Sequence, residues 1–496
     1  MRTFKIGTRG SLLAVTQCTL IAQEMSKKTG ANFELVKIKT QGDLQTEKPL
    51  WQLDGKDFFT KELDTALLKN QVDLVVHSYK DLGSDRPEGI SLATITERKY
   101  ANDILLIKKE TIKKIPTLET FNVGTSSPRR IVNTEKSLAD FLPGRTEKLE
   151  VKCSMLRGNV NTRIQKLQDG NYDAIILALA GLERLANKEE SLKELKTLLD
   201  GLDFMIMPQN VFPSSASQGA LAIEYNSNNK DEELLSVLKS VHCEKTAKEV
   251  AKERELFQTY GGGCHLAVGI HTFSHKDLLI SIEKGEYDNK EIHNTTFTGA
   301  NFDPSKYSNT FLSLGDADKL ISKKLLSPKL LDNKQYFITS RYCIAPTESL
   351  KSSTFWASGT STMKALVKSG RWVSGSADSL GHERIKEFIN SAAVQIMTGS
   401  KEVLVLSHDK ASSPIGETIG CYQRTLTEEK QDLSKYDSFY WPSFFQYESY
   451  VNAYPQIKDK AHFCGIGKTY DQFLSKKIAV NPIPNMQWLK KHFKTN

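Results

Sequence analysis

Short apolar runs that end in small residues and lead into amphipathic segments recur along this chain, and they constrain its fold most. The runs at 4–7, 33–39 and 174–178 predict strands, whereas the spacing of apolar residues over 12–28 and 161–170 predicts helices. Strands that alternate with amphipathic helices are typical of α/β folds. We therefore expect the first part of the chain to be an α/β structure.

The pattern changes and then returns further along the chain. Alternating polarity over 278–298 predicts strands, and the spacing over 317–325 predicts a helix, which together indicate a small α+β domain. A second α/β series follows, with strands predicted at 336–339, 354–357, 402–407, 438–441 and 462–465. Two of these strands run into related turns, 357–362 and 464–469, so we expect two similar lobes.

Composition limits the class of protein. A chain of 496 residues is expected to form about three or four domains. Its formal charge of +8 suits anionic small molecules as well as nucleic acid. We see no secretory signal and no apolar run near the roughly 20 residues that a bilayer span needs. We therefore expect a cytoplasmic protein, in which seven scattered cysteines without metal-ligand spacing indicate free thiols and no metal site.

A first candidate site follows the apolar run that starts at Asp73. This run ends in His77 and Ser78, and Lys80 and Asp81 come directly after it. Ligands of open α/β sheets bind at the carboxyl ends of strands, where a lysine can hold an anion and a carboxylate a cation. A solvated pair of loop charges is the alternative interpretation.

A second candidate is the turn between a strand and a helix at 123–130. Hydroxyl and guanidinium groups surround the expected helix N-terminus, which favours an anion site: Thr125, Ser126, Ser127, Arg129 and Arg130. An ordinary N-cap with surface arginines fits the same residues. Further cationic and hydroxyl groups lie at the ends of other elements, at Arg9, Ser11, Arg157, Arg163 and Arg184. This distribution suits a pocket for several carboxylates better than a stripe for nucleic acid, although solvated surface arginines are the alternative.

A third candidate is Cys264, which follows three glycines at 261–263. A thiol on such a loop is accessible, so it can act as a nucleophile or as an attachment point.

Taken together, these segments closely resemble the hydroxymethylbilane synthase family, also called porphobilinogen deaminases. The matching blocks cover residues 1 to about 330: Gly7–Ala14, Lys56–Leu63, His77–Asp81, Val123–Arg130, Leu156–Arg163, Tyr172–Leu185, Gln218–Glu224 and Gly262–Cys264. One departure is Ser217, which stands where the family usually has a glycine.

The resemblance implies two α/β lobes of the periplasmic-binding-protein type and a small α+β domain around a cleft. We expect one lobe at 1–97 and 206–228, a second at 98–205 and the α+β domain at 229–331. The family condenses four porphobilinogen molecules, with release of ammonia, on a dipyrromethane primer, which Cys264 would hold through a thioether. Asp81 and Lys80 would be catalytic, and Asp81 would stabilise the pyrrole nitrogens.

Both residues would also bind the cofactor, together with Arg9, Ser11, Thr125, Ser126, Ser127, Arg129, Arg130, Arg157 and Gly158. Phe59, Arg163 and Arg184 would bind the substrate porphobilinogen.

Residues 332–496 resemble uroporphyrinogen-III synthases, which close the linear product into a macrocycle. The segments that match this family are Phe337–Ser340, Trp356–Thr362, Gly375–Gly381, Tyr422–Thr425, Trp441–Ser443 and Gly465–Thr469. The resemblance implies two α/β lobes with the site between them, Tyr422 as a catalytic residue, and Ser443 and Thr469 as substrate-binding residues. The opening βα portion of the first lobe is missing from this range, so the domain is expected to be shortened.

Three functions therefore remain open at this point. The first is a bifunctional, monomeric enzyme that makes hydroxymethylbilane and cyclises it, without nucleic acid or membrane as a partner. The second is an active deaminase with a non-catalytic C-terminal module. The third is a two-lobed protein that binds an anionic ligand, because fold likeness alone does not carry function.

Overall fold

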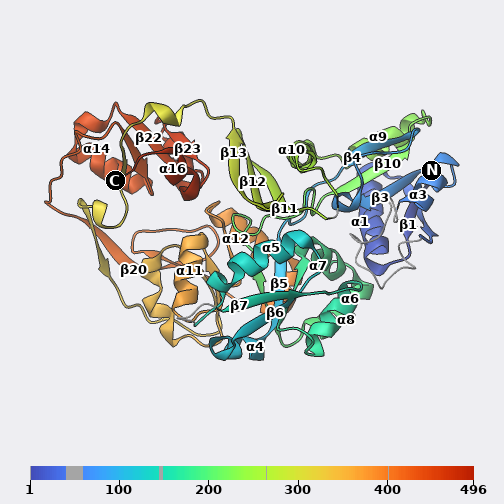
Figure 1. The fold of residues 1–496 in the computed structure, drawn as a ribbon, viewed down its shortest axis with the longest axis horizontal. Coiled ribbons are helices and arrows are strands. Elements are labelled where there is room, and N and C mark those ends of the chain that lie inside the picture. Colours follow the sequence, from blue (N-terminus) through green and yellow to red (C-terminus); the bar gives the residue numbers. More distant parts are fainter. Residues whose placement is uncertain (1, 41–59, 145–148, 264, 400, 496) are drawn as a thin grey trace. The chain divides into compact units, whose positions relative to one another are not determined.

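The computed structural model describes residues 2–40, 60–144, 149–263, 265–399 and 401–495. Two compact units make up the chain. Unit 1 comprises Met1–Phe273, Ser281–Asn294 and Ser391–Gly399, and unit 2 comprises Ser274–Ile280, Thr295–Asn390 and Ser400–Asn496. Their elements can be followed by label in Figure 1.

Unit 1 contains two five-stranded sheets built on the same plan. The first has the order β2 (Asn32–Ile38), β1 (Thr3–Arg9), β3 (Leu74–Ser78), β10 (Leu221–Asn226) and β4 (Ile90–Ile95). The second has the order β7 (Glu150–Ser154), β6 (Thr120–Gly124), β8 (Ala174–Ala178), β5 (Asp103–Lys108) and β9 (Leu202–Ile206). In each sheet one strand runs antiparallel to both neighbours, β10 in the first and β5 in the second. The expected pair of α/β lobes is therefore confirmed.

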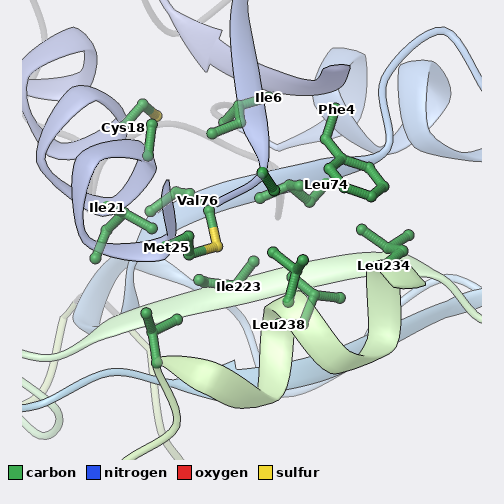
Figure 2. Packing of buried hydrophobic residues seen from close by; sticks show 14 of the residues in the cluster. Phe4, Ile6, Cys18, Ile21, Met25, Leu74, Val76, Ile223, Leu234 and Leu238 are labelled. Carbon is green, nitrogen blue, oxygen red and sulfur yellow. The ribbon is translucent and has the colours of Figure 1, made fainter. Parts of the chain in front are cut away.

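The first lobe has its core between its sheet and two helices (Figure 2). Helix α1 (Leu12–Thr29) places Cys18, Ile21 and Met25 against side chains of β1, β3 and β10, and helix α9 (Glu232–Ser240) adds Leu234 and Leu238. Burying each such aliphatic side chain contributes about 1.5–3 kcal/mol. This packing fixes the sheet whose strand ends carry Lys80 and Asp81.

Two segments connect the lobes, because the chain leaves the first after β4 and returns to it through β10. We call 96–102 and 207–220 the two crossings. Helix α10 (Glu244–Thr259) then leads to a three-stranded sheet of β11 (Ala267–His275), β12 (Leu278–Tyr287) and β13 (Lys290–Thr298).

Unit 2 contains two further sheets. The first has the order β14 (Thr310–Leu312), β21 (Ser438–Trp441), β22 (Ala461–Gly465) and β23 (Asn481–Ile483). The second has the order β15 (Ile321–Leu325), β20 (Glu417–Leu426), β19 (Val403–His408), β16 (Gln335–Ile338), β17 (Thr354–Ala357) and β18 (Gly375–Ser376). The predicted strand-to-helix turns lead into α11 (Thr360–Lys368) and α15 (Lys468–Ser475).

Two expectations for residues before 332 are wrong. The segment 317–325 is not a helix, since Ile321–Leu325 forms strand β15, which pairs with β20. The boundary at 331 also fails, because β14 pairs with β21 and thus belongs to the C-terminal sheets. Strands β14 and β15 therefore both pair with strands from residues after 332.

None of the helices in the described part of the chain combines the length and apolar character that crossing a bilayer requires. The same residues contain no cluster of histidine, cysteine and acidic groups that could hold a metal ion.

Candidate functional site

The carboxyl end of β3 carries the two residues that the sequence singled out first. Lys80 and Asp81 lie in a single 3-10 turn, Tyr79–Asp81, directly after the strand. The Nζ atom of Lys80 donates to Oε1 of Gln218 at 3.3 Å, whereas Asp81 is exposed to solvent. Burial lowers the pKa of Lys80 to about 8, and the charge of Asp81 opposes this shift. Lys80 therefore loses its proton more readily than a lysine exposed to water.

Asp103, at the start of β5, is the centre of the positive cluster in the second lobe. Its carboxylate accepts hydrogen bonds from Nη1 of Arg129 at 2.8 Å and from Nη2 of Arg130 at 2.7 Å. Nε2 of Gln218 donates to the same carboxylate at 2.9 Å. Since Gln218 also accepts from Lys80, one hydrogen-bonded chain joins the turn after β3 to helix α5 (Pro128–Ser137).

The cluster is buried, and its charges stabilise one another. Burial alone would raise the pKa of Asp103, but Arg129 and Arg130 hold it well below its ordinary value. Arg129 also donates to the carbonyl oxygen of Pro213 in the second crossing at 2.8 Å. Both arginines were predicted to bind the cofactor directly, whereas the structure pairs each of them with Asp103. Sequence reasoning missed Asp103, although an acidic residue at the head of an apolar strand was a visible signal.

Two other arginines, Arg157 and Arg163, have fewer hydrogen-bond partners in the described structure than Arg129 and Arg130. Burial, reinforced by the charges of Arg130 and Arg157, lowers the pKa of Arg163 to about 10. Nε of Arg163 donates to the carbonyl oxygen of Gly158 at 2.7 Å. Nε of Arg157 is buried and has no hydrogen-bond partner within the part of the chain that the structure describes. A buried donor without an acceptor is costly, so Arg157 is suited to an anionic ligand.

Gly158 has a φ of +116°, and a Cβ atom there would lie 2.8 Å from Thr162. The glycine is therefore required by the backbone that carries Arg157.

The remaining predicted groups mainly shape the site. Oγ of Ser126 donates to the carbonyl oxygen of Leu156 at 2.8 Å, which ties the turn after β6 to the turn after β7. Thr125 is buried, Ser127 precedes helix α5, and Ser11 caps helix α1 by accepting from the amide of Ala14 at 3.3 Å. Arg9 is half-buried at the end of β1.

Arg184 and Glu253 both form hydrogen bonds with the crossings. The Nη2 atom of Arg184, on helix α7 (Leu179–Ala186), donates to the carbonyl oxygen of Gly219 at 2.8 Å. Burial lowers the pKa of Arg184 to about 10. Glu253, on α10, accepts from Nη2 of Arg98 at 2.9 Å and from the amide of Ser217 at 2.6 Å, so a single carboxylate contacts both crossings.

Ser217 itself lies in the left-handed region, with a φ of +64°. This conformation explains physically why a glycine would be favoured at this position.

Two predicted residues, Phe59 and Cys264, lie outside the described residues. The helix that precedes Cys264 is described, and Tyr260 at its end donates from its hydroxyl to Glu283 on β12 at 2.6 Å.

The C-terminal candidates lie in unit 2. Ser443 caps helix α14 (Phe444–Ala453) by accepting from the amide of Gln446 at 3.3 Å, and Oγ1 of Thr469 donates to the carbonyl oxygen of Pro442 at 3.1 Å. These two hydroxyls therefore follow neighbouring strands, β21 and β22. Tyr422 lies on β20 in the other sheet, with its ring 5.3 Å from that of Tyr342. Burial raises the pKa of Tyr422.

Comparisons with known proteins identify a family that this chain resembles in sequence. The family model described as "Porphobilinogen deaminase, dipyromethane cofactor binding domain" matches residues 4–234. The porphobilinogen deaminase of Oceanobacillus iheyensis is 36% identical over 302 residues, which are 60% of this chain and 90% of that protein. The enzyme of the same name from Streptococcus sanguinis is 38% identical over 269 residues, which are 53% of this chain and 80% of that protein.

Among solved structures, the immunogenic lipoprotein A of Vibrio vulnificus is 14% identical, with a TM-score of 0.29, and the match covers 50% of this chain and 98% of that one. The methionine-binding protein MetQ is also 14% identical, with a TM-score of 0.28, over 51% of this chain and 94% of that one. At such TM-scores these likenesses carry no argument.

Proposed function

Because the chain belongs to the porphobilinogen deaminase family, we propose that it condenses four porphobilinogen molecules head-to-tail on a dipyrromethane primer, with release of ammonia. The family's cofactor-binding domain is present in residues 4–234. The observation that carries the proposal is the gathering of Lys80, Asp81, Arg157 and Arg163 in the lobes that form this domain.

The described residues fit the cofactor. Dipyrromethane bears carboxylates, and the side chains that would neutralise them are Arg157, whose Nε has no partner, Arg163 and Lys80. Cys264 would anchor the group through its sulfur. When bound, the cofactor supplies the pyrrole carbon to which the first substrate molecule is joined.

The protein's own groups have separate tasks in this proposal. Asp81, exposed beyond the end of β3, accepts hydrogen bonds from the N–H groups of the pyrrole rings and stabilises positive charge that develops when ammonia leaves. Lys80 and Arg163 hold the acetate and propionate groups. Arg129 and Arg130 are fixed by Asp103, so they contribute a rigid positive wall behind these groups.

The direct assay is to supply the purified chain with porphobilinogen and to follow ammonia and bilane together. Catalytic release of ammonia with formation of a linear tetrapyrrole is expected. Stoichiometric binding of porphobilinogen without ammonia would instead establish the alternative, a two-lobed protein that binds an anionic ligand.

A second activity, cyclisation of the bilane to uroporphyrinogen III, is proposed for unit 2. It is supported by the two sheets, by the hydroxyls of Ser443 and Thr469, which follow the neighbouring strands β21 and β22, and by the buried phenol of Tyr422. The linear product is labile, so a chain that carries both activities would have the enzyme that uses this product at hand as it forms.

Isomer analysis tests this second activity. The chain alone should convert porphobilinogen to type III uroporphyrinogen, and Tyr422→Phe should shift the product towards type I while ammonia release is unchanged. Type I alone from the wild-type chain would mean that unit 2 is a non-catalytic module. The cytoplasmic location and the monomeric state remain predictions.

A further inference from the structure

A pocket of about 520 Å³ opens in unit 2, at the first turns of α12 (His382–Ile389) and α15. Its lining includes His382 and Lys468 from these turns and Ser412 and Ser413 from the segment after β19. The lining also contains the acidic residues Glu383 and Asp471, and the volume of the pocket suits part of a ligand larger than a single ring.

Lys468 is the central cation of this pocket. Its Nζ atom donates to the carbonyl oxygen of Ser412 at 3.5 Å, and no carboxylate lies within 4.0 Å of it in the described ranges. Burial lowers the pKa of His382, and the charge of Lys468 lowers it further. The ammonium group of Lys468 thus lines the pocket and has no carboxylate partner among the described residues.

A second cation, Arg424, lies on β20. Its Nη2 atom is 2.9 Å from Nε2 of His408. Since a guanidinium can only donate, His408 accepts this hydrogen bond and is neutral. Burial, followed by the charge of Arg424, lowers the pKa of His408 to about 4, and Lys468 contributes to the same shift. Arg424 lies over the ring of Phe445 at 4.2 Å and forms no ion pair with a described carboxylate.

Two acidic groups line the pocket, and each has a cationic partner. Asp471 lines the pocket but is paired with Lys276, and Glu383 is 3.9 Å from Lys386. Asp409 acts on Arg424 and His408 only at a distance. We use the name basic cluster for the two cations Arg424 and Lys468 together with the two imidazoles of His408 and His382.

We propose that the basic cluster binds carboxylate groups of a linear tetrapyrrole, with Arg424 and Lys468 as the principal contacts. The inference rests on the proposed cyclase function and deepens it by assigning substrate-binding residues. Tyr422 and Arg424 are two residues apart on a regular stretch of β20, so their side chains lie on the same face of the strand. A carboxylate on Arg424 would therefore bring the bilane to the phenol that cyclisation is proposed to use.

The test uses the full-length chain and uroporphyrin III, a stable tetrapyrrole with carboxylates on every ring, as the probe. Binding is followed by quenching of tryptophan fluorescence in the wild type and in Arg424→Met/Lys468→Met. The double variant should bind the probe at least tenfold more weakly, because it loses the hydrogen bonds that Arg424 and Lys468 would donate to carboxylates of the probe. It should also make type I product in place of type III while consuming porphobilinogen at the wild-type rate.

Two variants separate this role from a structural one. Arg424→Lys keeps the charge and should restore most of the affinity. Arg384→Met removes a cation from α12 that is paired with Glu387 at 2.7 Å, and it should bind the probe as the wild type does.

The test distinguishes failure of the proposed carboxylate site from failure of the proposed cyclase function. Unchanged probe affinity and unchanged type III product in the double variant would overturn the inference and leave the cyclase in place. A wild type that makes only type I product, yet binds the probe through Arg424 and Lys468, would support the carboxylate site and overturn the cyclase.

Discussion

The guanidinium of Arg130 holds the carboxylate of Asp103 with two hydrogen bonds, 2.7 Å from Nη2 to Oδ1 and 3.1 Å from Nε to Oδ2. Both side chains are buried, so the pair is shielded from water and salt. Asp103 in addition binds Arg129 and Gln218, which makes it the anion on which the positive wall of the site depends.

Asp103→Asn should therefore destabilise the protein strongly. Loss of the carboxylate leaves two buried guanidiniums without a counter-charge, and breaking such a buried pair lowers the free energy of unfolding by about 3 kcal/mol or more. Urea denaturation measures this change. Glu97→Gln, at a side chain that is 73% exposed, is the control and should change stability by less than about 0.5 kcal/mol. Equal stabilities for both variants would refute the structural role of Asp103.

Asp81→Ala should abolish turnover while the cofactor stays attached. The carboxylate is the proposed partner of the pyrrole nitrogens, and its loss removes a group that acts in the chemistry rather than in folding. Rates of ammonia release and intact mass are measured on the same sample. Asp85→Ala, at another exposed aspartate four residues along the same segment, should keep near-normal rates. Normal turnover in the Asp81 variant would show that its assigned role is wrong.

Loading of the cofactor should depend on the charge of Lys80. Its pKa is lowered to about 8, so the ammonium that attracts carboxylates is present below this pH and is lost as the pH rises through it. In cofactor-free chain, made in a host without porphobilinogen, the rate of cofactor attachment should fall above about pH 8. Lys80→Arg stays protonated and should remove this fall. An identical pH profile in both proteins would exclude Lys80 as its origin.

Ser217→Gly should stabilise the protein, although it deletes a side chain. The serine has a φ of +64°, and its buried Oγ has no hydrogen-bond partner in the described structure. Relief of the left-handed strain outweighs the greater freedom of glycine in the unfolded chain, so we expect a gain of about 0.5–1 kcal/mol in denaturant unfolding. Ser215→Gly, where φ is not positive, should instead lose stability. A loss at both positions would contradict this explanation.

Much of the fold could be predicted because the strands of the two lobes are short apolar runs with clear turns. Ala174–Ala178, Thr354–Ala357 and Ser438–Trp441 have the bounds that the pattern predicted. The segment at 321–325 could not be predicted, since its partner on β20 lies about a hundred residues further on and decides its conformation. The domain boundary was wrong for the same reason.

The sequence predicted which residues form the site but not which hydrogen bonds they make within the protein. The sequence identified Arg129, Arg130 and Arg184 as cationic groups, but it could not show that Asp103 and the carbonyl of Gly219 already bind them. Such partners come from other strands and crossings, so the sequence around each arginine does not identify them. Asp81 is exposed, and Nε of Arg157 has no partner among the described residues, so for these two the sequence-based roles remain direct proposals.

Intact mass tests the central claim, that Cys264 holds the primer in a pocket that neutralises its carboxylates. The purified chain should be heavier than its sequence by one dipyrromethane. Cys264→Ser should lose both this mass and the activity, whereas Cys243→Ser, at another thiol of unit 1, should keep both. A wild-type chain that has the mass of its sequence alone, even after incubation with porphobilinogen, would contradict the account.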